Sequence, residues 1–107
     1  MSTRLTLRRA TVADGPMLQT MERTAGEQFR TIGMAHIADD EPPSLERLAY
    51  YATTGRSWVA TVDDERTVVG YCLADVVDDN AHLEQISVLP QWQGHGVARQ
   101  LFGVLRA

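Results

Sequence analysis

The stretch from Leu83 to Leu105 constrains the fold of this chain more than any other, and it reads LEQISVLPQWQGHGVARQLFGVL. Its first six residues, 83–88, are rich in strand formers, and Pro90 ends that strand. A glycine-containing loop follows, and after it the apolar residues recur at helical spacing: Val97, Leu101, Val104 and Leu105. The sequence therefore predicts a strand, a tight loop and an amphipathic helix in direct succession.

The loop in this stretch has the composition of a phosphate site. Gly94 and Gly96 carry no Cβ, so the backbone can turn sharply and approach a ligand closely. The helix that follows presents free N–H groups and the positive end of its dipole to the loop. Such a run of amides binds anions, most naturally phosphate, and we expect a phosphate-bearing cofactor here.

The same residues resemble a known family motif. Gln93-x-x-Gly96-x-Ala98, preceded by the strand Leu83–Val88 and by Val-Leu-Pro, resembles motif A of the GNAT superfamily of acetyl-CoA-dependent N-acetyltransferases. The alternative interpretation is an ordinary strand-to-helix turn. A nucleotide-binding loop is less favoured, because the stretch lacks the Lys-Ser/Thr pair of a P-loop and does not open a βαβ unit.

Length and composition restrict the number of domains, the location of the protein and the kinds of site it can carry. A chain of 107 residues corresponds to one domain, 1–107. No apolar run approaches the roughly 20 residues that a membrane span needs, and the start MSTRLTLRRA resembles a strand, so we expect a cytoplasmic protein without a membrane partner. The single cysteine, Cys72, offers neither a disulfide framework nor zinc spacing; we expect a small buried residue and no metal site.

The charges are distributed unevenly along the chain. The net charge is −4, and all fourteen acidic residues lie at or before Glu84. A polyanionic cofactor would therefore meet the less acidic C-terminal segment, whereas the acidic remainder suits a cationic amine. The same balance argues against nucleic acid, which requires a basic patch.

The apolar periodicity predicts an α/β (α+β) fold with the order β-α-α-β-β-β-α and a mainly antiparallel sheet. The GNAT resemblance implies the same order. Gly70, inside one predicted strand, suggests a bulge or a close approach of another backbone. The expected strands cover residues 4–10, 57–62, 67–77 and 81–88, and the expected helices cover 12–28, 44–51 and 97–105.

The resemblance also implies which residues hold acetyl-CoA. The pantetheine arm would lie along Ile86, Ser87 and Val88, and a backbone amide near Val88 would polarise the thioester carbonyl. The pyrophosphate would rest on the loop and the first helical turn: Gln93, Gly94, His95, Gly96, Val97, Ala98 and Arg99.

An acetyltransferase also needs a base and an acceptor pocket. Glu84 is the favoured base, on the expectation that it shares a strand face with His82, Ile86 and Val88. An exposed glutamate paired with an arginine is the equally weighted alternative, and His82 is a second candidate. Four aromatic residues could line the acceptor pocket or could pack in the core: Phe29, Tyr50, Tyr51 and Trp58.

The predicted activity is transfer of an acetyl group from acetyl-CoA to an amine of a small molecule or peptide, by direct attack in a ternary complex. The alternative is a non-catalytic CoA-binding module or an inactive fragment, because GNAT domains continue beyond the cofactor helix and this chain stops at Ala107. An uncovered strand at 81–88 would be a template for pairing, so we expect a homo-oligomer.

Overall fold

The computed structural model describes residues 4–30, 42–63 and 67–105, and for 26–30 and 105 it describes the backbone only. Four strands, three α-helices and two 3₁₀ turns follow one another in these segments. In chain order they are β1 (Thr6–Arg9), η1 (Val12–Asp14), α1 (Gly15–Arg30), α3 (Leu45–Thr53), β2 (Ser57–Val62), β3 (Thr67–Val77), β4 (Asn80–Val88), η2 (Pro90–Trp92) and α4 (Val97–Leu105).

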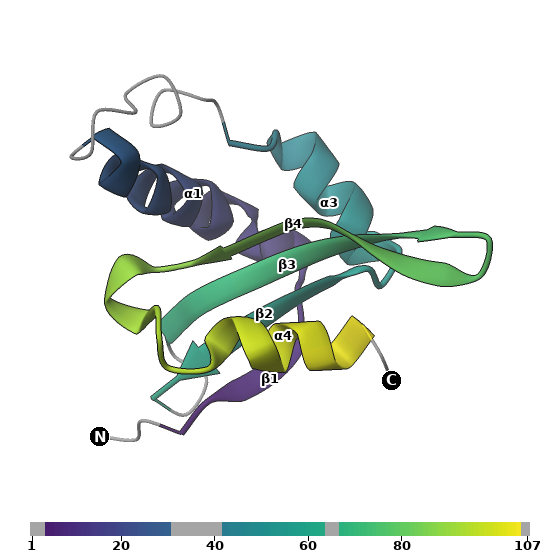
Figure 1. Ribbon diagram of the computed structural model, residues 1–107. Helices are drawn as coiled ribbons and strands as arrows, with labels where there is room; N and C mark the ends of the chain where they lie inside the picture. Colours follow the sequence, from purple (N-terminus) through teal and green to yellow (C-terminus); the bar gives the residue numbers. More distant parts are fainter. Residues whose placement is uncertain (1–3, 31–41, 64–66, 106–107) are drawn as a thin grey trace.

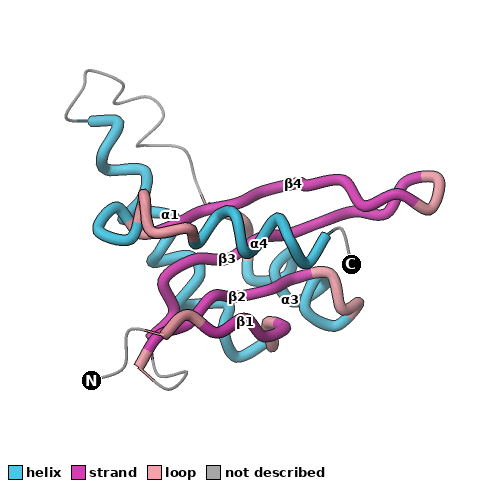
Figure 2. The backbone as a smooth tube through the Cα atoms, turned by 60° about the horizontal axis from the view of Figure 1, so that its bottom comes forward, coloured by secondary structure: helices cyan, strands magenta, loops and turns pink. Residues whose placement is uncertain are grey.

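The four strands form one antiparallel sheet in the order β1-β2-β3-β4, covered by helices on both faces (Figure 1). Helices α1 and α3 pack on one face through Leu18, Met21, Leu48 and Tyr51 against Val59, Tyr71 and Leu73. Helix α4 packs on the other face through Val97 and Leu101 against Ala60, Val69 and Cys72. The cores lie between these layers, and the β3–β4 hairpin extends beyond them (Figure 2).

Two bulges interrupt the register of the sheet. Ala60 pairs with Gly70 but Thr61 pairs with Val68, so Val69 is an extra residue in β3. Leu73 pairs with Gln85 but Ala74 pairs with Leu83, so Glu84 is an extra residue in β4. Because side chains alternate between faces along a strand, each bulge reverses the alternation from that point onward.

The observed order of elements confirms the fold class and the order predicted from the sequence. Strands β2 and β3 have the expected bounds. The first helix differs, because it begins as the 3₁₀ turn η1 and continues as α1 to Arg30. The expected loop around 33–43 lies largely outside the described residues.

The carboxylate of Asp14 stabilises the turn that leads into α1. Asp14 accepts two hydrogen bonds from the Arg8 guanidinium, at 2.9 and 3.0 Å, and one from the Thr11 amide at 2.7 Å. The hydrogen bonds from Arg8 lower the pKa of Asp14, although burial opposes the shift. A carboxyl group whose pKa is lower in the folded state stabilises the fold above its unfolded pKa, and this contribution disappears as the pH falls through the folded pKa.

We therefore expect Asp14→Asn to lower the free energy of unfolding at neutral pH by about 1 kcal/mol, the usual cost of losing a helix cap. The deficit relative to wild type should shrink below about pH 4, where the unfolded carboxyl group begins to protonate. Urea melts at neutral and acidic pH measure both effects, with the exposed turn variant Asp79→Asn as control. An undiminished deficit at pH 2 would contradict this account.

Candidate functional site

The loop between η2 and α4 turns through two left-handed glycines. Gly94 has φ = +83° and Gly96 has φ = +82°. A Cβ built on either glycine would meet nothing within 4 Å. The space beside both residues is therefore open, while their backbone conformation is one that other L-residues rarely adopt.

The start of α4 leaves its first amides available. The Gln100 amide donates to the Gly96 carbonyl at 3.1 Å, which makes this the first hydrogen bond of the helix. The amides of residues 96–99 precede that bond, so they have no partner in the helix. The exposed Arg99 side chain adds a positive charge in the same turn. Backbone donors, the helix dipole and a cation are the features that favour an anion at a helix terminus.

Helix α4 can approach the sheet closely because residue 70 is a glycine. A Cβ at Gly70 would lie 2.9 Å from Val97 Cγ1 and 3.1 Å from the Ser87 carbonyl oxygen. Both features that the sequence suggested for Gly70 are present, since the bulge at Val69 is adjacent. The position of the loop on the sheet therefore depends on the absence of a side chain here.

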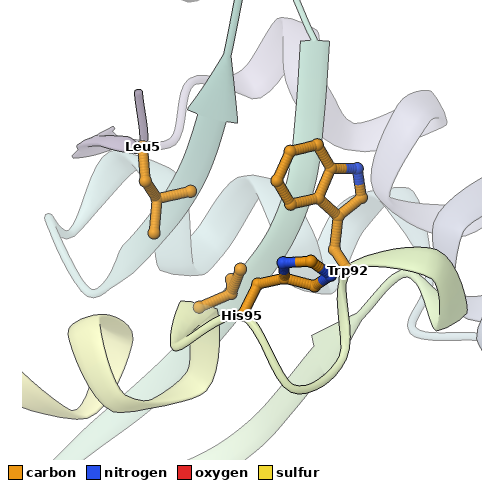
Figure 3. Close-up of a pocket in the computed structure, with 4 residues that line it drawn as sticks. Leu5, Trp92 and His95 are labelled. Atoms are coloured by element: carbon orange, nitrogen blue, oxygen red, sulfur yellow. The ribbon is translucent and has the colours of Figure 1, made fainter. Parts of the chain in front are cut away.

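A pocket of about 350 Å³ lies beside the loop and is lined by Leu5, Trp92, His95 and Val97. The Trp92 and His95 rings lie tilted to each other at 58° with centroids 5.4 Å apart, and Leu5 of the segment before β1 lies opposite them (Figure 3). His95 is exposed to solvent. An aromatic pair, one ring from η2 and one from the loop, therefore lies beside the start of α4.

The strand before the loop presents different chemistry on its two faces. Ile86 and Val88 pack toward α4, whereas Ser87 points toward α1. The Gln93 side chain donates to the Val88 carbonyl at 3.3 Å and so ties the loop to the end of β4. The residues predicted to bind the cofactor, 86–88 and 93–99, thus lie in succession from the end of β4, past η2, into α4.

A polar cluster lies on the α1 face of β4 and was not predicted from the sequence. Glu22 accepts a hydrogen bond from the Tyr71 hydroxyl at 3.2 Å and another from the Ser87 hydroxyl. Gln85 donates to the Tyr71 oxygen at 3.1 Å. Burial, and after it the charge of Glu22, raise the pKa of Tyr71, so its phenol stays protonated and donates. The available signal was Tyr71 itself, because a buried tyrosine hydroxyl requires a polar partner.

Glu84 lies elsewhere than the sequence predicted. Its expected place on one face with Ile86 and Val88 is wrong, because the bulge at Glu84 puts Leu83 in that core cluster instead. The Glu84 carboxylate accepts a hydrogen bond from Arg47 of α3 at 3.0 Å, and both side chains are 43% exposed. Glu84 is therefore the exposed glutamate paired with an arginine that the alternative interpretation expects. His82, the second candidate, is also exposed on β4.

The aromatic residues proposed for an acceptor pocket do not gather in one place. Tyr51 is buried in the α1/α3 core, and its hydroxyl donates a hydrogen bond to the Asp75 carboxylate. Tyr50 is exposed. Trp58 lies on the opposite face, in a groove shared with Arg9, Val76 and Val104. The side chain of Phe29 lies outside the described residues.

The other sequence-based expectations concern Cys72, metals and membranes. Cys72 is buried as expected, and burial raises the pKa of its thiol to about 11. Within segments 4–30, 42–63 and 67–105 we find no cluster of three or more potential metal ligands. None of the described helices has the length and apolar character that crossing a membrane would require.

Residues 18–106 match the Acetyltransferase (GNAT) family, a region that covers most of the chain and includes β4, the loop and α4. The chain therefore belongs to the GNAT acetyltransferase family.

Solved structures show the same fold. The ribosomal-protein-S18-alanine N-acetyltransferase from Escherichia coli aligns with a TM-score of 0.68 at 21% identity, covering 95% of this chain and 57% of that protein. The PaiA N-acetyltransferase from Thermoplasma acidophilum, solved in complex with coenzyme A, gives a TM-score of 0.71 at 14% identity, with 96% and 70% covered. An acetyltransferase from Thermus thermophilus gives 0.66 at 24% identity, with 99% and 70% covered. The chain thus spans little more than half of the Escherichia coli enzyme.

Proposed function

We propose that this protein transfers an acetyl group from acetyl-CoA to an amine of a small molecule or peptide. The observation that carries this proposal is the loop at the start of α4. Two left-handed glycines leave open space beside a set of free helix amides, in a chain that belongs to an acetyltransferase family. A pyrophosphate group is the anion that such a terminus suits.

Acetyl-CoA, a co-substrate in this scheme, fits the residues along β4 and the loop. The amides of residues 94–98 and the Arg99 side chain would hold the pyrophosphate, since the Gln93 amide already donates to the Pro90 carbonyl. Ile86, Ser87 and Val88 would hold the pantetheine arm through their backbone. An amide near Val88 would stabilise negative charge on the thioester oxygen during attack.

The amine must lose a proton before it attacks. Two carboxylates contact groups on the α1/α3 side of β4: Glu84, our proposal from the sequence, and Glu22. The excess of acidic residues before the loop favours a cationic acceptor.

Calorimetric titration with CoA and with acetyl-CoA tests the cofactor proposal. Saturable binding with one site per chain supports it, whereas no heat of binding at millimolar CoA would reject it. Binding without any acetyl transfer would instead favour a non-catalytic CoA-binding module. That alternative is kept because the chain spans 57% of the Escherichia coli enzyme.

We further propose that copies of this chain associate through β4. Among the described residues β4 pairs with β3 alone, so its outer edge presents backbone groups for another strand. Apolar side chains are exposed nearby: Val76 is 51% exposed, Val77 49%, and Phe102 of α4 41%. We expect light scattering to give a mass above that of the monomer at micromolar concentration, and Ala81→Lys to lower it. A wild-type monomer with a cooperative melt would contradict this association.

A further inference from the structure

Glu22 is the acceptor in both of its hydrogen bonds with hydroxyl groups. An ionised carboxylate can only accept, so both Tyr71 and Ser87 must donate their hydroxyl protons to Glu22. Gln85 in turn donates to the Tyr71 oxygen, and the Ser87 hydroxyl is also a hydrogen-bonding neighbour of Tyr71. A Ser87 hydroxyl that gives its proton to Glu22 can still accept a hydrogen bond, and an N–H group is a suitable donor for it.

The residues that carry the cluster are held in the buried core between α1 and the sheet. Tyr71 is fully buried in β3, and Leu18 and Met21, from the same helix as Glu22, are buried at 2% exposure each. Glu22 has no arginine among its partners in the described segments, where its contacts are the two hydroxyl groups. Glu84, by contrast, is neutralised by Arg47. Among the described residues, the partners of the Glu22 carboxylate are thus hydroxyl groups.

The location of Ser87 connects this cluster to the proposed reaction. Its backbone belongs to the segment 86–88 proposed for the pantetheine arm, and its side chain is on the α1 face, opposite to Ile86 and Val88. Ser87 is only partly buried, so it can meet a ligand. An acceptor that approaches from the α1 side would therefore reach the Ser87 hydroxyl next to the thioester.

We propose that Ser87 contacts the acceptor amine and that Glu22 receives the amine's proton through the Ser87 hydroxyl. This inference rests on the proposed acetyl transfer. Ser87 accepts the proton from the amine nitrogen while its own proton passes to the Glu22 carboxylate. The nitrogen lone pair then forms the C–N bond, and the C–S bond breaks with its electrons going to sulfur. The acylated nitrogen gives its excess proton to the CoA thiolate, and Glu22 returns its proton to solvent. Ser87 is thus the catalytic residue and Glu22 a positioning residue.

The test is steady-state acetyl transfer to benzylamine and lysine methyl ester as probe amines, together with calorimetry for CoA. Glu22→Gln keeps an acceptor for both hydroxyl groups but cannot take a proton, so kcat should fall about 10²-fold, the usual worth of a general base. CoA affinity should stay within twofold of wild type, because the loop is untouched. Ser87→Ala should lower kcat by about tenfold or more.

Two further variants separate the chemical role from a structural one. Added formate should restore part of the kcat of Glu22→Ala, because a small carboxylate can occupy the vacated place, whereas a merely structural loss would not respond. Glu46→Gln removes a negative charge from the exposed first turn of α3 and is the matched control. Circular dichroism melts of each variant confirm that it is folded.

The outcomes distinguish this inference from the function on which it rests. A wild type that binds CoA and acetylates neither probe contradicts the proposed function, and the inference falls with it. A wild type that turns over while Glu22→Gln matches Glu46→Gln overturns the inference alone. If kcat falls about 10²-fold in Glu84→Gln while Glu22→Gln keeps the wild-type kcat, the inference is also overturned. Glu84 would then be the group that receives the proton of the amine.

Discussion

Replacing Gly96 by valine should weaken CoA binding by about 100-fold or more, which corresponds to about 2.8 kcal/mol. Two effects combine at this position. The φ of +82° is one that a β-branched residue does not tolerate, so the loop must change its shape. The new side chain would also enter the open space beside the helix amides, where the pyrophosphate is proposed to lie. Losing even two charge-assisted hydrogen bonds accounts for a change of this size.

The control for this experiment is Gly55→Val. Gly55 also has a left-handed backbone, with φ = +72°, but it follows α3, and only the Arg9 side chain lies within 4 Å of its Cβ position. This variant should suffer a comparable backbone strain and should bind CoA as wild type does. Calorimetry measures both variants at one temperature and salt concentration. Unchanged CoA affinity in Gly96→Val would show that the loop is not the pyrophosphate site.

Replacing Gly70 by valine should lower the free energy of unfolding by about 3 kcal/mol, at the upper end of the cost of overpacking a core. The added Cβ would overlap Val97 on one side and the Ser87 carbonyl on the other. A backbone oxygen within a sheet cannot rotate away as a side chain can. Helix α4 must therefore move outward, and the loop moves with it, so CoA affinity should fall as well.

Gly103→Ala is the matched control for Gly70→Val. Gly103 lies in α4 with nothing within 4 Å of its Cβ position, so alanine there should stabilise the protein by about 0.5–1 kcal/mol through helix propensity. Chemical denaturation of the two variants gives both values. Equal stabilities for Gly70→Val and wild type would mean that α4 does not need to approach the sheet this closely.

The sequence predicted the order of elements because each element has a strong local signal. Each of these signals depends only on residues that are close together in the chain. Examples are the alternating pattern of residues 57–62, the turn residues Asp78 and Asp79, and the helical spacing of Val97 and Leu101. The glycine loop was predictable for the same reason, since its two glycines and the helix after it are contiguous in the chain.

The register of β4 could not be predicted in this way. A bulge depends on how two strands pair, and nothing in HLEQIS indicates that Glu84 is the extra residue. One inserted residue moved Glu84 away from the face of Ile86 and Val88. The contact between Glu22 and Ser87 joins residues 65 positions apart, so it depends on how α1 crosses the sheet.

The most direct test of the account is the release of free CoA from acetyl-CoA in the presence of a panel of primary amines, with mass spectrometry of the amine products. The central claim predicts that thiol release depends on both the enzyme and the amine, and that each CoA released is matched by one acetylated amine. CoA that binds without amine-dependent thiol release, for any amine in the panel, would contradict the claim that this protein is an acetyltransferase.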